Sequence, residues 1–303
     1  MFKIRINSSL LLVFLLVPPP PLAAQEISTL TFLEGVLRVI RGTTVLQGAE
    51  GARLRQGDII ESSTPGFAQL EFAGGTTVAL GASSRLFLFN YSRGNRGGKA
   101  DTAQLVLLSG WLKGETAVSG GAYRYASPLL AAATNDGTVV MHATAQETEI
   151  FIESGSANIA EVSPNGNWGQ SVRAKVGQFL SRSAGKNVTN SARPTSTFIE
   201  SVPRPFRDTL PSRLSRFEKP VELRRDHEVT YSEIESWLNI GQTWRKGFVE
   251  RFKPRLKNAE FRRAVEAHLN NHPEWDSVLH PEKRPPTPVP AHDTDSPDGR
   301  YPR

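Results

Sequence analysis

Apolar and polar side chains alternate in short runs from about residue 26 to residue 180, and Gly, Asn, Asp and Ser separate the runs. Residues 68–72, AQLEF, form one such run, and the next run follows the doublet Gly74-Gly75, which suits a hairpin turn with positive φ. Residues 86–89, LFLF, are apolar on both faces, so we expect a central strand that is covered on both sides. The pattern predicts a mainly β protein, built of short antiparallel strands as a sandwich or a solenoid-like stack.

The chain changes character over residues 185–228, where prolines alternate with arginines and single aromatic residues. This density of proline disfavours regular secondary structure. Phe198, Phe206 and Phe217 nevertheless recur as apolar anchors, which a free linker would lack. We therefore predict an extended strap, without regular structure, that lies across the β-domain.

A helical period follows the strap. Thr230-Tyr231-Ser232-Glu233 fits a capping box at the start of a helix, and Gly241 is a natural end for that helix. A second helix is expected from aromatic residues spaced four apart: Trp244, Phe248 and Phe252. Asn258 is a suitable N-cap for a third helix. The pattern predicts a small helical bundle that is held together by its own aromatic core.

The N-terminus has the order of features typical of a secretory signal peptide. Lys3 and Arg5 precede an apolar run at residues 10–17, and small residues precede a cleavage site that we place after Ala24. The apolar run is shorter than the roughly 20 residues that span a bilayer. We expect five segments: a signal peptide (1–24), a β-domain (25–184), a strap (185–228), a small helical domain (229–282) and a disordered tail (283–303). The mature protein is therefore expected to be periplasmic or secreted, without a transmembrane helix.

Composition and motifs argue against an enzyme. The 303 residues include no cysteine, which excludes disulfides, thiol catalysis and cysteine-ligated zinc. The sequence has no phosphate-binding loop and no nucleophile elbow. His268, His272, Asp276 and His280 follow the i, i+4 spacing of a helical metal site, but Pro273 interrupts the helix within the series. We therefore expect no catalytic residue, no cofactor and no metal.

Positive charge is concentrated in the C-terminal helices. The formal net charge is +6, and it falls to +4 once Lys3 and Arg5 are removed with the signal peptide. A local cluster contains eight bases: Arg245, Lys246, Arg251, Lys253, Arg255, Lys257, Arg262 and Arg263. These residues either form a face for an anionic polymer or membrane, or a solvated face opposite the aromatic core stripe, which the periodicity favours. Nucleic acid is not an expected partner of an exported protein.

The β-region carries an ordered set of short motifs: Gly35-Val36, Arg41-Gly42, Gly57-Asp58-Ile59-Ile60, Ala68-Gln69-Leu70-Glu71-Phe72, Gly75-Thr76, Val78-Ala79-Leu80, Ser84-Arg85-Leu86, Ser127-Pro128, Gly137-Thr138, Glu153-Ser154-Gly155 and Gly177-Gln178-Phe179. Over about residues 33–182 this set resembles the FecR domain family, which is named after a periplasmic regulator of ferric citrate uptake. Residues 231–279 look like the helical extension of some proteobacterial FecR-domain proteins. One departure is Gly74-Gly75-Thr76, where the family usually has Asp-Gly-Ser.

The residues shared with the family have physical explanations as turn residues. Gly57 supplies a turn conformation, and Asp58 can accept hydrogen bonds from backbone amides nearby, so we assign them, with Gly74, Gly75 and Gly137, to a structural turn motif. The family's regulators couple an outer-membrane receptor to a cytoplasmic sigma factor through a spanning helix. With a cleavable signal instead, this chain is expected to be a non-catalytic envelope sensor or scaffold that binds other proteins. The alternative is a binding module for anionic glycan, peptidoglycan or surface polysaccharide.

Overall fold

The computed structural model describes residues 25–94, 101–118 and 121–281. The predicted signal peptide (1–24) and tail (283–303) lie outside the described residues. Strands make up 48% of the chain and helices 21%, with the helices gathered in a small C-terminal region, which confirms the predicted fold class. Within the described part of the chain, no helix is both long enough and apolar enough to cross a membrane.

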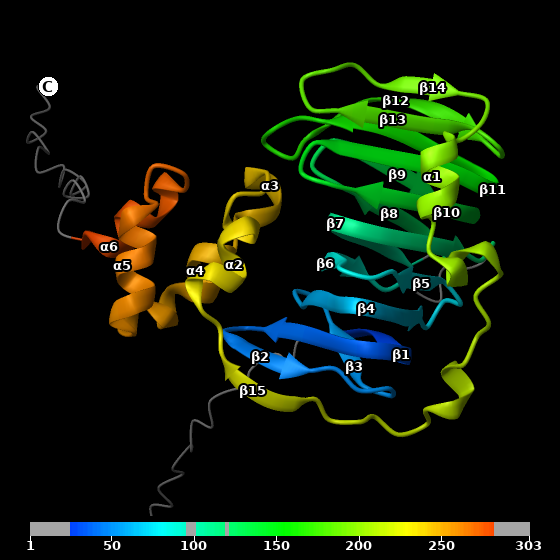
Figure 1. Ribbon diagram of the computed structural model, residues 1–303. Helices are drawn as coiled ribbons and strands as arrows, with labels where there is room; N and C mark the ends of the chain where they lie inside the picture. The colour runs from blue at the N-terminus through cyan, green and yellow to red at the C-terminus, as the bar shows by residue number, and fades with distance from the viewer. Residues whose placement is uncertain (1–24, 95–100, 119–120, 282–303) are drawn as a thin grey trace, which may run out of the picture.

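The strands lie one above another in a stack, from β1–β3 at one end to β12–β14 at the other (Figure 1). They are β1 (Glu26–Arg41), β2 (Thr44–Gln47), β3 (Arg53–Arg55), β4 (Ile59–Phe72), β5 (Thr77–Leu80), β6 (Arg85–Ser92), β7 (Thr102–Thr116), β8 (Ala122–Ala126), β9 (Leu130–Thr134), β10 (Gly137–Ala143), β11 (Glu147–Val162), β12 (Trp168–Lys175), β13 (Phe179–Ser183), β14 (Thr189–Ser191) and β15 (Arg224–Glu228). All strand pairs are antiparallel except β7 with β8. The stack is therefore the solenoid-like of the two predicted architectures.

Long strands turn a corner and so belong to two walls of the stack. The first half of β7 pairs with β6 and β8, and its second half pairs with β5 and β10. Gly110, at the corner, has a φ of +91°, which favours glycine. In β11 the corresponding corner is at Gly155, with a φ of +68°. The two walls enclose an interior core that includes Leu70, Leu105 and Ile159.

Each wall also has an outer apolar surface, because the strands alternate side chains between faces. In β6, Leu88 points into the interior, whereas Phe87 points outward to the C-terminal helices. This confirms the prediction that residues 86–89 form a strand covered on both sides. On the other wall, Trp111 and Val140 point outward to residues of the strap.

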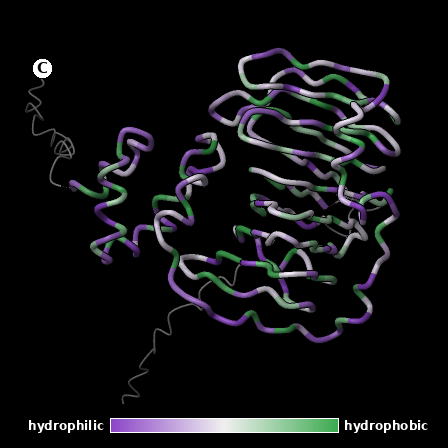
Figure 2. Tube along the Cα trace, in the orientation of Figure 1, coloured by the Kyte–Doolittle hydropathy of each residue, from purple (hydrophilic) through white to green (hydrophobic). Residues whose placement is uncertain are grey.

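The strap (185–228) runs along the stack from its β14 end to β15 (Figure 1). Figure 2 shows it as hydrophilic stretches broken by hydrophobic positions. Phe198 and Phe206 are buried against the wall, at 2% and 1% exposure. The expectation that the strap lacks regular structure is wrong. It contains α1 (Ser196–Ser201), the 3₁₀ turns η1 (Arg204–Arg207) and η2 (Leu214–Arg216), and strands β14 and β15.

The prolines of the strap permit this because they flank the helix rather than interrupt it. Pro194 precedes α1 and Pro203 follows it. The hydroxyl of Thr195 accepts a hydrogen bond from the N–H of Phe198 at 3.1 Å and caps the first turn. Pro205 lies in the first turn of η1, where its missing N–H has no partner to lose.

The C-terminal helices are α2 (Tyr231–Leu238), α3 (Gln242–Arg245), α4 (Phe248–Phe252), α5 (Ala259–Ala267) and α6 (Asp276–Leu279), with the 3₁₀ turns η3 (Lys253–Lys257) and η4 (Pro273–Trp275). The backbone N–H of Thr230 donates to the Glu233 carboxylate at 2.8 Å, in agreement with the predicted capping box. Asn258 caps α5 through Phe261 N–H at 2.9 Å. The single helix expected through Trp244 and Phe252 is instead two short ones, α3 and α4.

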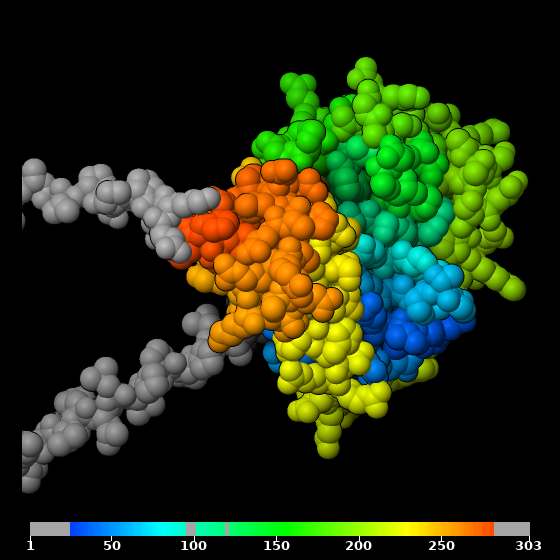
Figure 3. Space-filling view, turned by 60° about the vertical axis from the view of Figure 1, so that its left-hand side comes forward, coloured from blue at the N-terminus to red at the C-terminus, as the bar shows by residue number. Residues whose placement is uncertain are grey.

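The helices do not form a bundle around a core of their own, contrary to the sequence-based expectation. They lie over one side of the stack (Figure 3). The ring of Phe87 in β6 packs 6.1 Å from Trp237 and 5.3 Å from Phe248, measured between ring centroids. The same cluster includes Ile40 and Val162 of the wall. The aromatic stripe of the helices is therefore the cover of the β-domain.

Candidate functional site

The predicted turn at Gly57 and Asp58 is a closed structural unit. Gly57 has a φ of +89°, and the Asp58 carboxylate accepts the N–H of Arg55 at 2.8 Å. Asp58 is 1% exposed, and Arg41 donates to both of its oxygens, at 3.0 and 2.7 Å. This bidentate pair neutralises the buried carboxylate. The sequence motif gave no sign of Arg41 as the partner.

The other glycines of the predicted turn motif divide into two groups. Gly75 and Gly137 have φ values of +84° and +97°, a region that side chains with a Cβ rarely adopt. Gly74 is not among the residues with positive φ, so the doublet needs glycine at its second position only. A Cβ at Gly137 would lie 2.3 Å from the Ser154 carbonyl oxygen, which adds a steric requirement.

Arg251, predicted as part of a basic face, is instead a buried connector. Its guanidinium donates to the carbonyl oxygens of Gly57 at 2.6 Å, Ile40 at 2.7 Å and Gly42 at 3.0 Å. Burial lowers the pKa of Arg251 to about 10, and the charge of Asp58 opposes that shift. The helix period placed this residue on the polar side of α4, but the polar groups that it meets belong to the β-domain.

Two further bases of the predicted face are also used within the molecule. Arg245 forms an ion pair with Glu274 at 3.1 Å, and Arg255 donates to the Val229 carbonyl at 2.8 Å. The predicted face is therefore reduced to the five bases that remain exposed: Lys246, Lys253, Lys257, Arg262 and Arg263. Arg262 is additionally paired with Glu266 at 2.9 Å.

The histidine series is dispersed by the structure. His268 stacks on Tyr231 with ring centroids 5.2 Å apart, His280 pairs with Asp276 at 2.9 Å, and His272 is fully buried. Burial lowers the pKa of His272, which keeps its ring neutral. In the described ranges, no group of three or more His, Cys, Asp or Glu side chains is arranged to hold a metal ion.

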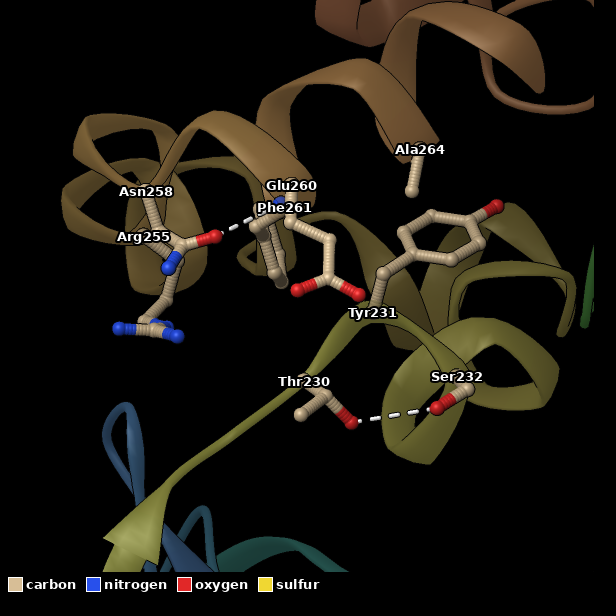
Figure 4. Close-up of a pocket in the computed structure, with 8 residues that line it drawn as sticks. All are labelled: Thr230, Tyr231, Ser232, Arg255, Asn258, Glu260, Phe261 and Ala264. Atoms are coloured by element: carbon tan, nitrogen blue, oxygen red, sulfur yellow. Dashed lines mark hydrogen bonds between the residues drawn. The ribbon is translucent and has the colours of Figure 1, made fainter.

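A polar cavity of about 200 Å³ opens between the start of α2 and the start of α5 (Figure 4). Its lining includes Tyr231, Arg255 and Glu260, with the carboxylate of Glu260 beside the opening. Arg255 is already committed to Val229. The cavity has the size of a site for water or a small polar group.

The strap is held by buried charges that the sequence analysis did not identify. Lys113 of β7 is 0% exposed, and its ammonium donates to the carbonyl oxygens of Phe206 and Asp208, both at 2.9 Å. Glu153 lies 3.0 Å from the same nitrogen and balances its charge. Lys113 occupies an outward position of an alternating strand, so the pattern alone indicates a solvated lysine. Only the strap, about 90 residues later, buries it.

Glu71 of β4 anchors the strap farther along. Its carboxylate accepts the hydroxyl of Ser212 at 2.6 Å and the N–H of Arg213 at 2.7 Å. Burial raises the pKa of Glu71, but these hydrogen bonds and that of Gln69 outweigh burial and leave the pKa below its ordinary value. The charged carboxylate is therefore the form that holds the strap.

An apolar groove of about 540 Å³ lies between α1 and the outer face of β10 and β11. Ile199, on the exposed side of α1, is 53% exposed beside it. The other residues that line the groove are Val140, Phe151, Glu153, Pro194, Phe198, Glu200, Val202, Phe206 and Arg207. The groove can accept apolar side chains, and charged groups stand at its rim.

Comparison with known protein families finds no matching family, and comparison with curated proteins finds no match. Among solved structures, two crystal structures of a candidate anti-sigma factor from Parabacteroides distasonis are similar, each at 9% sequence identity. The TM-scores are 0.36 and 0.37, over 45% and 47% of this chain. The chain spans 59% and 64% of those structures. Similarity at this level does not establish a common fold.

Proposed function

We propose that this protein is an exported, non-catalytic FecR-like module that binds other envelope proteins as a sensor or scaffold. The observation that carries the proposal is the apolar groove beside α1. Ile199 exposes more than half of its surface there, next to the aromatic rings of Phe198 and Phe151. An open concave apolar surface with a charged rim is typical of a site that receives side chains from another protein.

The groove is built on a rigid support. Phe198 packs against Trp111 and Phe179, with ring centroids 5.2 and 5.0 Å apart. Lys113 fixes the strap immediately after the groove, through Phe206. A groove held in this way is formed before a partner arrives, which lowers the entropic cost of binding.

Photocrosslinking in cells tests the proposal. A photoreactive amino acid at position 199 should give a discrete crosslinked band that contains a second envelope protein. Val36, which is 57% exposed on β1, is the matched control position and should give no such band. Crosslinks of equal strength at both positions, or none at position 199, would contradict the proposal. The intact mass of the periplasmic protein tests export, with Gln25 expected as the first residue.

The second candidate function is binding of an anionic glycan or surface polysaccharide. The bases that stay exposed on the helices support it: Lys246, Lys253, Lys257, Arg262 and Arg263. Retention of the mature protein on an anionic polysaccharide resin, abolished when these five residues are changed to Gln, would favour this function. Passage through the resin together with a co-purifying envelope protein would favour protein binding.

A further inference from the structure

Strand β12 has one free edge. It pairs with β11 only, from Ser156↔Lys175 to Val162↔Trp168. Lys175 turns both backbone groups away from β11, since its N–H donates to the Gln178 side chain at 2.7 Å and its carbonyl accepts the Gln178 N–H at 3.1 Å. Backbone groups of successive residues point to opposite sides of a strand, so Arg173 and Ser171 also direct their N–H and C=O outward. Such an edge is a template for another strand.

An apolar recess lies beside this edge, at the end of the stack. β12 ends one wall, and β13 and β14 end the other (Figure 1). Between them is a recess of about 340 Å³ whose apolar lining comprises Leu130, Ile159, Val172, Leu180 and Val188. Val172 is 57% exposed. The interior core therefore reaches the surface here, as it does at the uncapped end of a solenoid.

The opposite face of β12 is basic. Val172 pairs with Ile159 of the interior, so Arg173 and Lys175 point to the outer side of the wall. Both side chains are exposed, and Arg173 donates to Ser156 at 3.1 Å. A strand added to β12 would thus have one face beside positive charge and the other over an apolar recess.

We infer that the free edge of β12 binds an extended segment of a partner protein in which acidic and apolar residues alternate. The segment pairs with the outward backbone groups of Ser171 and Arg173. Its acidic side chains lie beside Arg173 and Lys175, and its apolar side chains enter the recess at Val172. This inference rests on the proposed function, because it names a second contact and the chemistry of the protein that makes it.

Charge favours such a segment over a second copy of this chain. Two β12 strands paired antiparallel about Val172 would place the two Arg173 side chains at diagonal positions on one face. Like charges at neighbouring positions of a sheet repel. An acidic strand instead offers a counter-charge to Arg173 and to Lys175.

A labelled eight-residue peptide of alternating Glu and Val, blocked at both ends, is the probe. Fluorescence anisotropy with the mature chain should show binding at least about tenfold tighter than for three control peptides. The controls are alternating Lys and Val, a block of four Glu followed by four Val, and the probe with N-methyl groups on alternate backbone nitrogens. Equal binding of the block peptide or of the methylated probe would overturn the inference.

Three variants separate the parts of the proposed contact. Arg173→Glu combined with Lys175→Glu should reverse the preference towards the Lys-Val peptide. Ser171→Pro removes an outward N–H without touching the β11 ladder, so it should weaken binding by about tenfold or more while the melting temperature stays close to that of the parent. Arg124→Glu is the matched control. Arg124 borders a polar depression of about 300 Å³ with Arg173, but it lies on β8, away from the free edge.

The same variants identify the other occupants. An oligosaccharide of uronic acids that binds as well as the peptide, and is lost with Arg124→Glu but kept with Ser171→Pro, would overturn the inference in favour of the depression. Sedimentation showing self-association that Ser171→Pro abolishes would overturn it in favour of a second copy. Failure of the peptide with crosslinking at Ile199 intact would reject this inference alone. Loss of the Ile199 crosslinks with peptide binding intact would reject only the groove.

Discussion

The guanidinium of Arg251 on α4 lies 2.6 Å from the carbonyl oxygen of Gly57, in the turn before β4. The same guanidinium also reaches the carbonyls of Ile40 and Gly42. One arginine of the C-terminal helices thus satisfies backbone acceptors of two neighbouring turns in the β-domain. This contact and the aromatic cluster around Phe87 join the helices to the stack.

Replacement of Arg251 by Met should destabilise the whole protein. The variant leaves the carbonyls of Ile40, Gly42 and Gly57 without their donor, and we expect a loss of about 2–4 kcal/mol in the free energy of unfolding. Urea denaturation followed by tryptophan fluorescence measures it. Arg263→Met is the matched control, because Arg263 is exposed and bonds only within its own helix, and it should change stability by less than about 0.5 kcal/mol.

Replacement of Lys113 by Met should release the strap. The change leaves Glu115 and Glu153 without their shared cation and removes the donor to Phe206 and Asp208. We expect a loss of about 3 kcal/mol and faster cleavage by trypsin at Arg204 and the other arginines of the strap.

Limited proteolysis followed by mass spectrometry checks the effect on the strap. Lys257→Met removes an exposed lysine and should leave the cleavage rate unchanged. A strap that is equally resistant in the Lys113 variant would show that its apolar anchors suffice.

The grip of Glu71 on the strap should depend on pH. Because its pKa is lower in the folded protein than in the unfolded chain, the unfolded state binds more protons in acid. Its contribution to stability is therefore complete above about pH 4.3, the ordinary glutamate pKa, and is lost as the pH falls through the lower folded value.

The variant Glu71→Gln isolates this contribution. The parent should exceed the variant in unfolding free energy by about 1–2 kcal/mol at pH 7, and the difference should shrink between pH 5 and pH 3. Thermal melts across this range measure it. A difference that stays constant down to pH 3 would show that the charge of Glu71 is not what holds the strap.

Alanine substitutions should rank the glycines of the turn motif by their surroundings. Gly137→Ala combines positive φ with a backbone clash and should cost at least about 2 kcal/mol. Gly57→Ala meets no atom within 4 Å, so only its φ opposes the change, at about 1 kcal/mol. Gly74→Ala should cost less than about 0.5 kcal/mol, since Gly74 lacks positive φ. Denaturant midpoints give the order, and a cost at Gly74 equal to that at Gly137 would contradict it.

Much of the local structure could be predicted from the sequence. Strict alternation located the strands, because the faces of a strand alternate with a period of two. Thr230 and Asn258 marked the starts of α2 and α5, since a cap depends only on residues three positions away. For the same reason the turn role of Asp58 towards Arg55 followed from its position.

Only the tertiary structure decided which segment covers each wall and which charges are buried. Lys113 meets Phe206 across 93 residues, and Arg251 meets Ile40 across 211. An alternating strand shows that two faces differ, but it does not show whether water, a strap or a helix lies on the outer one. Contacts between residues so far apart in the sequence depend on how the whole chain packs, so local pattern placed these bases on polar faces without revealing their partners. The free edge of β12 and the apolar recess beside it follow from the same packing.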